Sequence, residues 1–150
     1  MLIFLLGMPA SGKTTLGKKL AQQLDYAWVD LDDVIEEVEA RCITSLFQEK
    51  GETYFREQEQ KALHSVLSCK NTVVSTGGGT PCFFNNMQVI KRQGLSIFLN
   101  PPLQAIAKRI QTEENKRPMF QNFSEMELNL QLTKLYKERI TYYTQATWIF

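Results

Sequence analysis

The chain has 150 residues, of which 43% are hydrophobic and 22% are charged. This composition is typical of one folded globular domain and argues against a disordered chain. The 17 Lys and Arg residues against 16 Asp and Glu residues give a net charge of +1. No global field would therefore attract nucleic acid or an anionic membrane, and we expect neither as a partner.

Cysteine and histidine are too few for several kinds of site. The three cysteines, Cys42, Cys69 and Cys82, are far apart and form no CxxC pair. This argues against a disulfide framework or a zinc site and favours reduced thiols in a cytoplasmic protein. Because His64 is the only histidine, a metal site built from several histidines cannot form. No apolar run approaches the roughly 20 residues that span a bilayer.

The hydrophobic pattern predicts strands that alternate with helices. A continuous apolar strand at 2–6 precedes a helix at 12–24 that has leucines on one face. Further strands are expected at 27–30, 72–75, 95–99 and 147–150, and further helices at 33–41, 44–50, 52–68, 83–93, 103–112 and 125–143. This alternation is typical of an α/β fold in which helices cover both faces of a parallel sheet. Ligands of such folds bind beyond the carboxyl ends of the strands.

Residues 7–14, GMPASGKT, match the G-x-x-x-x-G-K-[ST] phosphate loop. They follow the first strand and open the first helix, which is the context in which this motif binds nucleotide phosphates. The loop backbone and the helix N-terminus bind phosphate oxygens, Lys13 faces the β- and γ-phosphates, and the Thr14 hydroxyl ligates Mg²⁺. The expected ATP contacts in this region are Gly7, Ala10, Ser11, Gly12, Lys13, Thr14 and Thr15.

Three aspartates lie at the end of the second predicted strand and just after it. Asp33 is expected to cap the helix that begins there. Asp30 and Asp32 alternate along an extended chain, so one can face Mg²⁺ through water and the other a substrate hydroxyl.

Two further features lie near the third predicted strand. Arg56 and Glu59 are three residues apart and share a helix face, a spacing that by itself favours a solvated ion pair. Three glycines at 77–79 follow the strand directly. Glycines expose backbone N–H groups that a ligand can approach closely, so we expect a loop that contacts substrate.

In this order and spacing, the phosphate loop, the Asp-x-Asp, the Phe-Arg-x-x-Glu and the triple glycine resemble the motifs of shikimate kinases. That family belongs to the nucleoside monophosphate kinase-like branch of phosphate-loop folds, and the likeness runs from residue 2 to the end. The resemblance implies one kinase domain over 1–150, with a three-layer α/β fold and a five-stranded parallel sheet in the order 2-3-1-4-5. It also implies a substrate-binding region at about 31–60 and a mobile lid at about 112–124.

The activity that this resemblance implies is ATP-dependent phosphorylation of the 3-hydroxyl of shikimate, in the pathway to chorismate and the aromatic amino acids. The family's Arg in Phe-Arg-x-x-Glu binds the shikimate carboxylate, which implies this role for Arg56. Arg139 resembles a second arginine that grips the carboxylate, although Thr141 stands where the family usually has proline. Glu59 resembles the acid that holds substrate hydroxyls or orients that arginine. Asp32 resembles the residue that contacts the acceptor hydroxyl and can act as its base.

Other roles transfer by position from the same resemblance. Gly78 and Gly79 resemble the backbone that contacts substrate. Arg117 resembles the lid arginine that closes over the β- and γ-phosphates, and Arg109 resembles the residue that stacks on adenine. Mg²⁺ is the expected cofactor, with Thr14 as a ligand and Asp30 acting through water.

Two other functions are open at this stage. A kinase for gluconate or a nucleoside monophosphate would keep the phosphate loop and the lid, and a nucleotide-binding module without catalysis would keep the loop. We expect a monomer. The chain ends at Phe150 inside the last predicted strand, where the family continues with an adenine-side loop and a helix. The C-terminal strand and helix are therefore expected to be truncated, with an incomplete adenine side.

Overall fold

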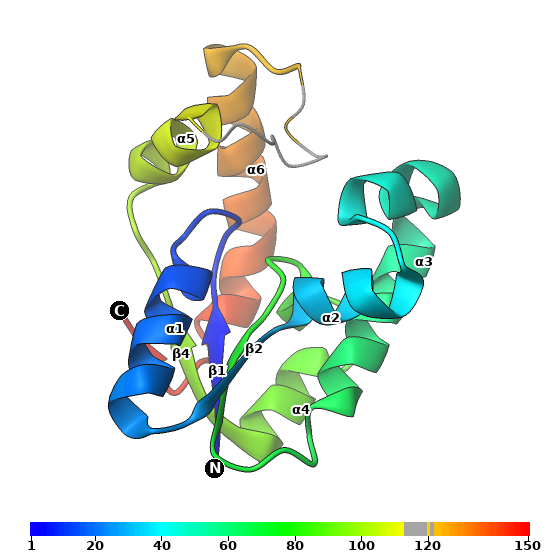
Figure 1. Cartoon of the computed structure of the whole chain (residues 1–150). Coiled ribbons are helices and arrows are strands. Elements are labelled where there is room, and N and C mark those ends of the chain that lie inside the picture. Colours follow the sequence, from blue (N-terminus) through cyan, green and yellow to red (C-terminus); the bar gives the residue numbers. More distant parts are fainter. Residues whose placement is uncertain (113–119, 121) are drawn as a thin grey trace.

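The strands form one parallel sheet with helices on both faces (Figure 1). The computed structural model describes residues 1–112, 120 and 122–150. Its strands are β1 (Leu2–Leu6), β2 (Ala27–Asp30), β3 (Thr72–Ser75), β4 (Gly94–Phe98) and β5 (Trp148–Ile149). They lie in the order β2-β3-β1-β4-β5, and each neighbouring pair is parallel. The predicted sheet order and the three-layer α/β fold are confirmed.

The helices lie close to their predicted positions. They are α1 (Lys13–Leu24), α2 (Leu31–Glu39), α3 (Ile43–Ser65), α4 (Asn86–Gln93), α5 (Leu103–Thr112) and α6 (Glu125–Tyr143), with a short 3₁₀ helix η1 (Thr80–Cys82). The bounds of α5 and α6 are those that the sequence predicted. Within the described residues, none of the helices is long and apolar enough to cross a membrane.

β1 lies at the centre of the core because helices cover both faces of the sheet around it. Leu2, Phe4 and Leu6 join the larger apolar cluster, which includes side chains of α3, α4, α5 and α6. Ile3 and Leu5 point to the opposite face and join a smaller cluster with α1. Burial of each large apolar side chain contributes about 1.5–3 kcal/mol. The buried central strand therefore fixes the position of the phosphate loop, which begins directly after its last residue.

Helix α2 begins two residues earlier than predicted, and the expectation that Asp33 caps it is wrong. Asp30 is the N-cap, with an extended backbone (φ −103°, ψ 126°), and its carboxylate accepts a hydrogen bond from the backbone N–H of Asp32 at 3.1 Å. Asp32 and Asp33 both lie in the first helical turn, where the helix dipole favours negative charge. Asp32 therefore projects from a helix and not from an extended chain.

Helix α3 consists of two segments that meet at Gly51, which agrees with the two helices predicted at 44–50 and 52–68. Gly51 has φ 83° and ψ 175°, a conformation that is essentially restricted to glycine. The first segment lies beyond α2, away from the sheet, and the second runs back toward α4 (Figure 1). The second segment carries Arg56 and Glu59.

The helix predicted at 83–93 is shorter in the structure. Phe83 has an extended backbone between η1 and α4, and α4 begins at Asn86. The Asn86 side chain donates a hydrogen bond to the Thr80 carbonyl at 2.9 Å. This contact ties the start of α4 to the loop that follows the three glycines.

Candidate active site

The phosphate loop, residues 7–14, curls at the end of β1 because three of its residues adopt positive φ. The values are 146° at Gly7, 58° at Ala10 and 100° at Gly12. Glycine is required at Gly7, because a Cβ there would lie 2.6 Å from the carbonyl oxygen of Leu99. Residues that alternate between right- and left-handed conformations direct successive N–H groups toward one concave side, which is the arrangement that binds anions.

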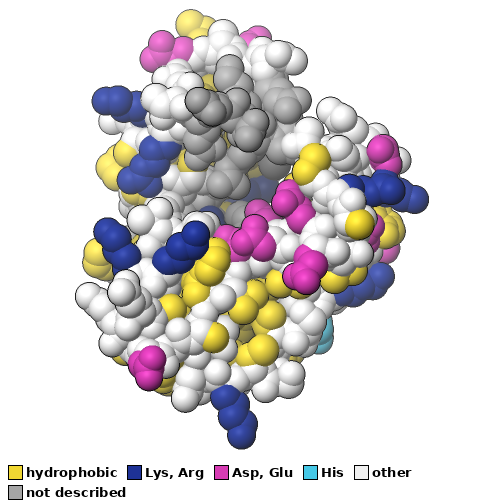
Figure 2. Space-filling view, in the orientation of Figure 1, with side chains coloured by type: hydrophobic (Ala, Val, Ile, Leu, Met, Phe, Trp, Pro, Cys, Tyr) yellow, Lys and Arg dark blue, Asp and Glu magenta, His cyan; other side chains and the backbone are white. Residues whose placement is uncertain are grey.

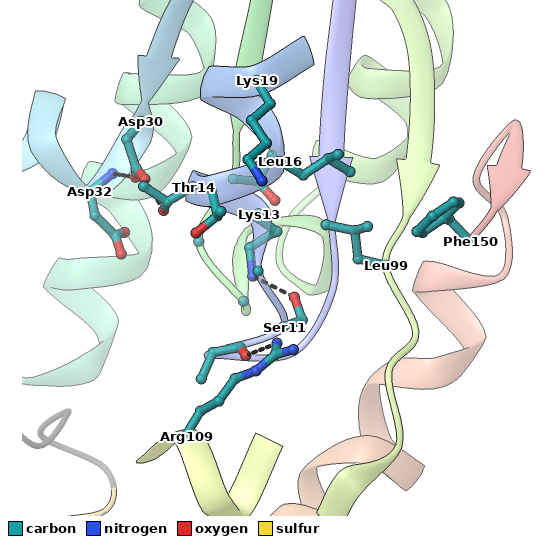
Figure 3. Close-up of a pocket in the computed structure, with 16 residues that line it drawn as sticks. Ser11, Lys13, Thr14, Leu16, Lys19, Asp30, Asp32, Leu99, Arg109 and Phe150 are labelled. Atoms are coloured by element: carbon teal, nitrogen blue, oxygen red, sulfur yellow. Dashed lines mark hydrogen bonds between the residues drawn. The ribbon is translucent and has the colours of Figure 1, made fainter. Parts of the chain in front are cut away.

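The ammonium group of Lys13 lies within the curve of this loop. It donates hydrogen bonds to the carbonyl oxygens of Gly7 at 2.9 Å and Met8 at 2.8 Å, and it lies 3.4 Å from the Ser11 hydroxyl (Figure 3). The side chain is buried. The charge is therefore held at a fixed position beside the loop backbone, as the phosphate-loop motif requires of its lysine.

Thr14 and Asp30 meet at the carboxyl ends of β1 and β2. The Thr14 hydroxyl donates to Asp30 Oδ2 at 2.9 Å, and Asp30 Oδ1 accepts the N–H of Asp32 (Figure 3). Burial raises the pKa of the Asp30 carboxyl, and the two hydrogen bonds partly oppose that shift. The hydroxyl and carboxylate oxygens brought together here are ligands that suit Mg²⁺.

A cavity of about 560 Å³ opens over the phosphate loop. Its lining includes the predicted ATP residues from Ala10 to Thr15, together with Asp30, Asp32, Gly78 and Arg109. Arg109 reaches from α5 to the loop, where its Nη1 donates to the Ala10 carbonyl at 3.0 Å (Figure 3). Gly7, also predicted to contact ATP, is not part of this lining, and its positive φ helps to curl the loop. The sequence reasoning missed several lining residues, which are Leu16, Lys19, Thr76, Gly77, Leu99 and Phe150.

The glycine loop, residues 77–79, gathers the acceptor-side residues. A Cβ on Gly77 would overlap Glu59 Oε1 and lie 3.2 Å from Asp32 Oδ1. A Cβ on Gly79 would overlap the guanidinium group of Arg56. Three predicted site residues from two helices therefore pack directly against this loop, which leaves no room for side chains on it.

Gly78 meets the fourth acceptor-side residue. A Cβ there would lie 3.1 Å from Arg139 Nη1 and 2.9 Å from Cδ of Pro9, in the phosphate loop. The Gly78 carbonyl accepts a hydrogen bond from the Tyr143 hydroxyl at 2.5 Å, and burial raises the pKa of that phenol. The glycine loop thus lies between the phosphate loop and the last two turns of α6.

Arg56 and Glu59 form a buried ion pair, not the solvated pair that their spacing suggested. Arg56 Nη1 donates to Glu59 Oε2 at 2.6 Å, and the side chains are 5% and 2% exposed. The other Glu59 oxygen accepts the Thr80 hydroxyl at 2.8 Å, and the Phe83 ring centroid lies 4.3 Å from Cζ of Arg56. Thr80 and Phe83 had no signal in the sequence, because they reach α3 only through the fold. With both oxygens engaged, Glu59 is placed to orient Arg56.

Arg139, from α6, is also buried. The Cys82 thiol lies close enough to Arg56 and Arg139 for both charges to act on it. Burial raises the pKa of Cys82 to about 11, and the two guanidinium groups oppose this shift. The two arginines predicted to bind one carboxylate therefore converge on the same part of the molecule.

Arg117, predicted as the lid arginine, lies outside the described residues, as does most of the lid expected at 112–124. On the face that Figure 2 shows, charged side chains form local groups, although both signs occur on each side of it. Figure 2 shows acidic side chains gathered over α2 beside a hollow, and Lys and Arg side chains over α1 and α5.

Comparisons of sequence with known proteins point to one family. The family model described as shikimate kinase matches residues 9–150. The shikimate kinase of Bacteroides thetaiotaomicron is 41% identical over 148 residues, which cover 99% of this chain and 85% of that protein. That of Clostridium botulinum is 39% identical over 145 residues, with 96% and 83% covered.

Solved structures agree with these matches. The crystal structure of the Bacteroides thetaiotaomicron shikimate kinase has a TM-score of 0.96 and covers 100% of this chain and 85% of that one. Shikimate kinase from Acinetobacter baumannii, solved in complex with shikimate, has a TM-score of 0.92 at 30% identity, with 99% and 82% covered. A deoxyadenosine kinase from M. mycoides, at 15% identity and a TM-score of 0.59, shares the fold alone. With a phosphate loop beside a glycine loop that gathers two carboxylates and two arginines, the chain belongs to the shikimate kinase family.

Proposed function

We propose that this protein transfers the γ-phosphoryl group of ATP to the 3-hydroxyl of shikimate. The observation that carries the proposal is the convergence of four side chains on the glycine loop, next to the phosphate loop. They are Asp32, Arg56, Glu59 and Arg139. Two guanidinium groups suit one carboxylate, and an aspartate near them suits a hydroxyl of the same small molecule.

The nucleotide side uses the phosphate loop. Its N–H groups and Lys13 bind the phosphates, and Arg109 borders the same cavity. Thr14 would ligate Mg²⁺ directly and Asp30 through water. No three Asp, Glu, His or Cys side chains of the described residues converge to form a metal cage. This fits Mg²⁺, which takes most of its ligands from ATP phosphates and water.

On the acceptor side, Arg56 and Arg139 would bind the shikimate carboxylate, and Glu59 would hold Arg56 in place. Gly78 and Gly79 would contact the ring through their backbone. Asp32 lies 3.2 Å from the position of a Cβ on Gly77 and lines the cavity above the phosphate loop. This position next to both loops supports the proposal that Asp32 orients the acceptor hydroxyl.

In the reaction, the shikimate hydroxyl oxygen attacks the γ-phosphorus and the bond to the β–γ bridging oxygen breaks, which releases ADP. The hydroxyl proton passes to Asp32 or to water. Such transfers depend mostly on positioning and on stabilisation of phosphate charge. Lys13, in the phosphate loop, supplies a positive charge that stabilises the phosphates, and Arg117 would add a second one from the lid. Bound Mg²⁺ would neutralise charge on the phosphates.

The test is a coupled assay of ADP release with shikimate and a panel of other acceptors, including gluconate and nucleoside monophosphates. Shikimate should be the preferred acceptor. Asp32→Asn should lower kcat by roughly 10²–10⁴ if Asp32 takes the proton, and by less if it only orients the hydroxyl. The matched control is Asp33→Asn, in the same helical turn but exposed, which should keep near-normal turnover. Near-normal turnover of Asp32→Asn, or a better acceptor than shikimate, would contradict the proposal.

We further propose a monomer that works in the cytoplasm without nucleic acid or membrane partners. The near-zero net charge and the reduced state expected of the three separate cysteines support this proposal. Sedimentation velocity at micromolar concentration should give a single species with the mass of one chain.

A further inference from the structure

One edge of the Arg56 guanidinium is held by a carboxylate that has no part in the proposed reaction. Glu52, one turn earlier in α3, accepts hydrogen bonds through Oε1 from Nη2 at 3.1 Å and from Nε at 3.3 Å. Its side chain is 57% exposed, whereas that of Arg56 is 5% exposed. A solvent-exposed carboxylate therefore lies on a buried cation.

The remaining sides of the guanidinium are closed by two buried groups and by the half-buried Phe83 ring. Glu59 takes Nη1, the Phe83 ring lies against one face, and the Gly79 backbone is in close contact. Displacing Glu59 or the Gly79 backbone would be costly, because both are packed in the interior. Glu52 can turn into water at little cost, since exposed ion pairs contribute little to stability.

The Nε–Nη2 edge is also one of the pairs of donors through which arginine binds a carboxylate bidentately. A substrate carboxylate that arrives from solvent therefore meets Arg56 where Glu52 already lies. In the absence of substrate, Glu52 satisfies donors of a buried guanidinium that would otherwise lack a partner.

We propose that Glu52 occupies the binding position of the substrate carboxylate on Arg56 when no substrate is present. The substrate must displace Glu52, and this competition sets the affinity for the substrate. The inference rests on the proposed function and deepens it. When shikimate binds, its carboxylate takes the Nε–Nη2 edge of Arg56, and Glu52 turns to solvent. Substrate affinity is thereby lower than Arg56 alone would give.

The test is calorimetric titration of the intact protein with shikimate. Glu52→Gln keeps the length of the side chain but weakens its hold on Arg56, so the Kd for shikimate should fall about two- to fivefold, the size of an exposed ion pair. Glu57→Gln is the matched control, because it removes the same charge from an exposed position next to Arg56 in the chain. Its Kd should change less than twofold.

Opposite outcomes are distinct. Weaker or unchanged binding of shikimate by Glu52→Gln would mean that Glu52 only orients Arg56. An equal gain in affinity in Glu57→Gln would mean that the effect comes from the net charge. Either result would overturn this inference but leave the proposed function standing. Failure of the unmodified protein to bind shikimate would overturn the proposed function as well.

A crystal structure of the shikimate complex gives an independent readout. The substrate carboxylate should lie on Nε and Nη2 of Arg56, with Glu52 beyond hydrogen-bond distance of both. Glu52 still bound to these two atoms beside the ligand would contradict the proposal. Thermal unfolding of Glu52→Gln should remain close to that of the unmodified protein, because the side chain is exposed.

Discussion

Arg56 shows how much the surroundings of a single residue decide its chemistry. Its spacing to Glu59 is that of many solvated helical pairs, yet both side chains are buried and the guanidinium has acidic partners on two sides. A buried arginine keeps its charge and presents donors in fixed directions, which lysine cannot reproduce. Binding of a planar carboxylate therefore depends on this residue type as well as on its charge.

Cys42 and Cys82 should differ in reactivity because their surroundings differ. Burial raises the pKa of Cys82 to about 11, whereas the Ser45 hydroxyl lowers the pKa of the exposed Cys42. Only a thiolate attacks iodoacetamide, and at pH 8 about one Cys82 in a thousand is a thiolate. We therefore expect peptide mass spectrometry to find Cys42 alkylated well before Cys82.

The difference should respond to pH and to unfolding in a defined direction. As the pH rises toward 11, the thiolate fraction of Cys82 increases and its labelling should accelerate. In urea, where the fold no longer shields Cys82, the two sites should react at similar rates. Equal rates in the folded protein at pH 8 would show that Cys82 is not shielded as the structure indicates.

At the scale of elements, the site depends on how helices begin and break. Asp30 caps α2 with one oxygen and accepts the Thr14 hydroxyl with the other, so a single carboxylate joins β2, α2 and the phosphate loop. Ser75, at the end of β3, accepts the Trp28 indole N–H at 3.1 Å and donates to the Lys13 carbonyl at 3.2 Å. These hydrogen bonds connect the ends of β2 and β3 to the phosphate loop, which fixes the site before any ligand arrives.

Gly51 gives a prediction about helix α3. A Cβ at this position would meet no atom within 4 Å, so any cost of Gly51→Ala comes from its φ of 83° alone. We expect the substitution to lower the free energy of unfolding by roughly 1–3 kcal/mol, measured by urea denaturation. Gln48→Ala, at an exposed helical position in the same element, should change it by less than about 0.5 kcal/mol. A neutral Gly51→Ala would mean that α3 can continue as one helix.

At the scale of the whole molecule, the residues proposed to bind the two substrates lie beyond the same edge of one sheet. The phosphate loop follows β1, Asp30 ends β2, the glycine loop follows β3 and Leu99 follows β4. The two clusters that flank β1 hold these strands in register. Ligands that bind this edge should therefore stabilise the entire fold and not one part of it.

Thermal unfolding tests this expectation. A ligand present at 100 times its Kd stabilises the folded state by about 2.7 kcal/mol. For a chain of this size, MgADP at that level should raise Tm by roughly 5–10 °C. Addition of EDTA should reduce the shift in Tm, because Mg²⁺ neutralises the phosphates. Adenosine at the same concentration as MgADP should produce a smaller shift, because it lacks the phosphates that the loop binds. A shift with adenosine as large as that with MgADP would contradict phosphate recognition by residues 7–14.

Much of this architecture follows from local patterns in the chain. The apolar run at 2–6, the phosphate-loop motif and the helical periods of 103–112 and 125–143 predict their elements correctly, because hydrophobic period and glycine placement act over a few neighbouring residues. The sequence also indicated that the site residues follow the strands. Local signals failed at α2, where Asp33 is a good capping residue but Asp30 forms the cap.

The tertiary structure alone decided how the site residues meet. Nothing near Glu59 in the chain indicated that it would be buried against Thr80, and nothing near Tyr143 indicated a hydrogen bond to the Gly78 carbonyl. Burial and ion pairing depend on atoms that the fold brings together from distant segments, whereas local preference depends only on neighbours. The sequence by itself therefore determined the parallel α/β sheet and the phosphate loop. The packing of α3 and α6 against the glycine loop determined the environment of Arg56 and Arg139.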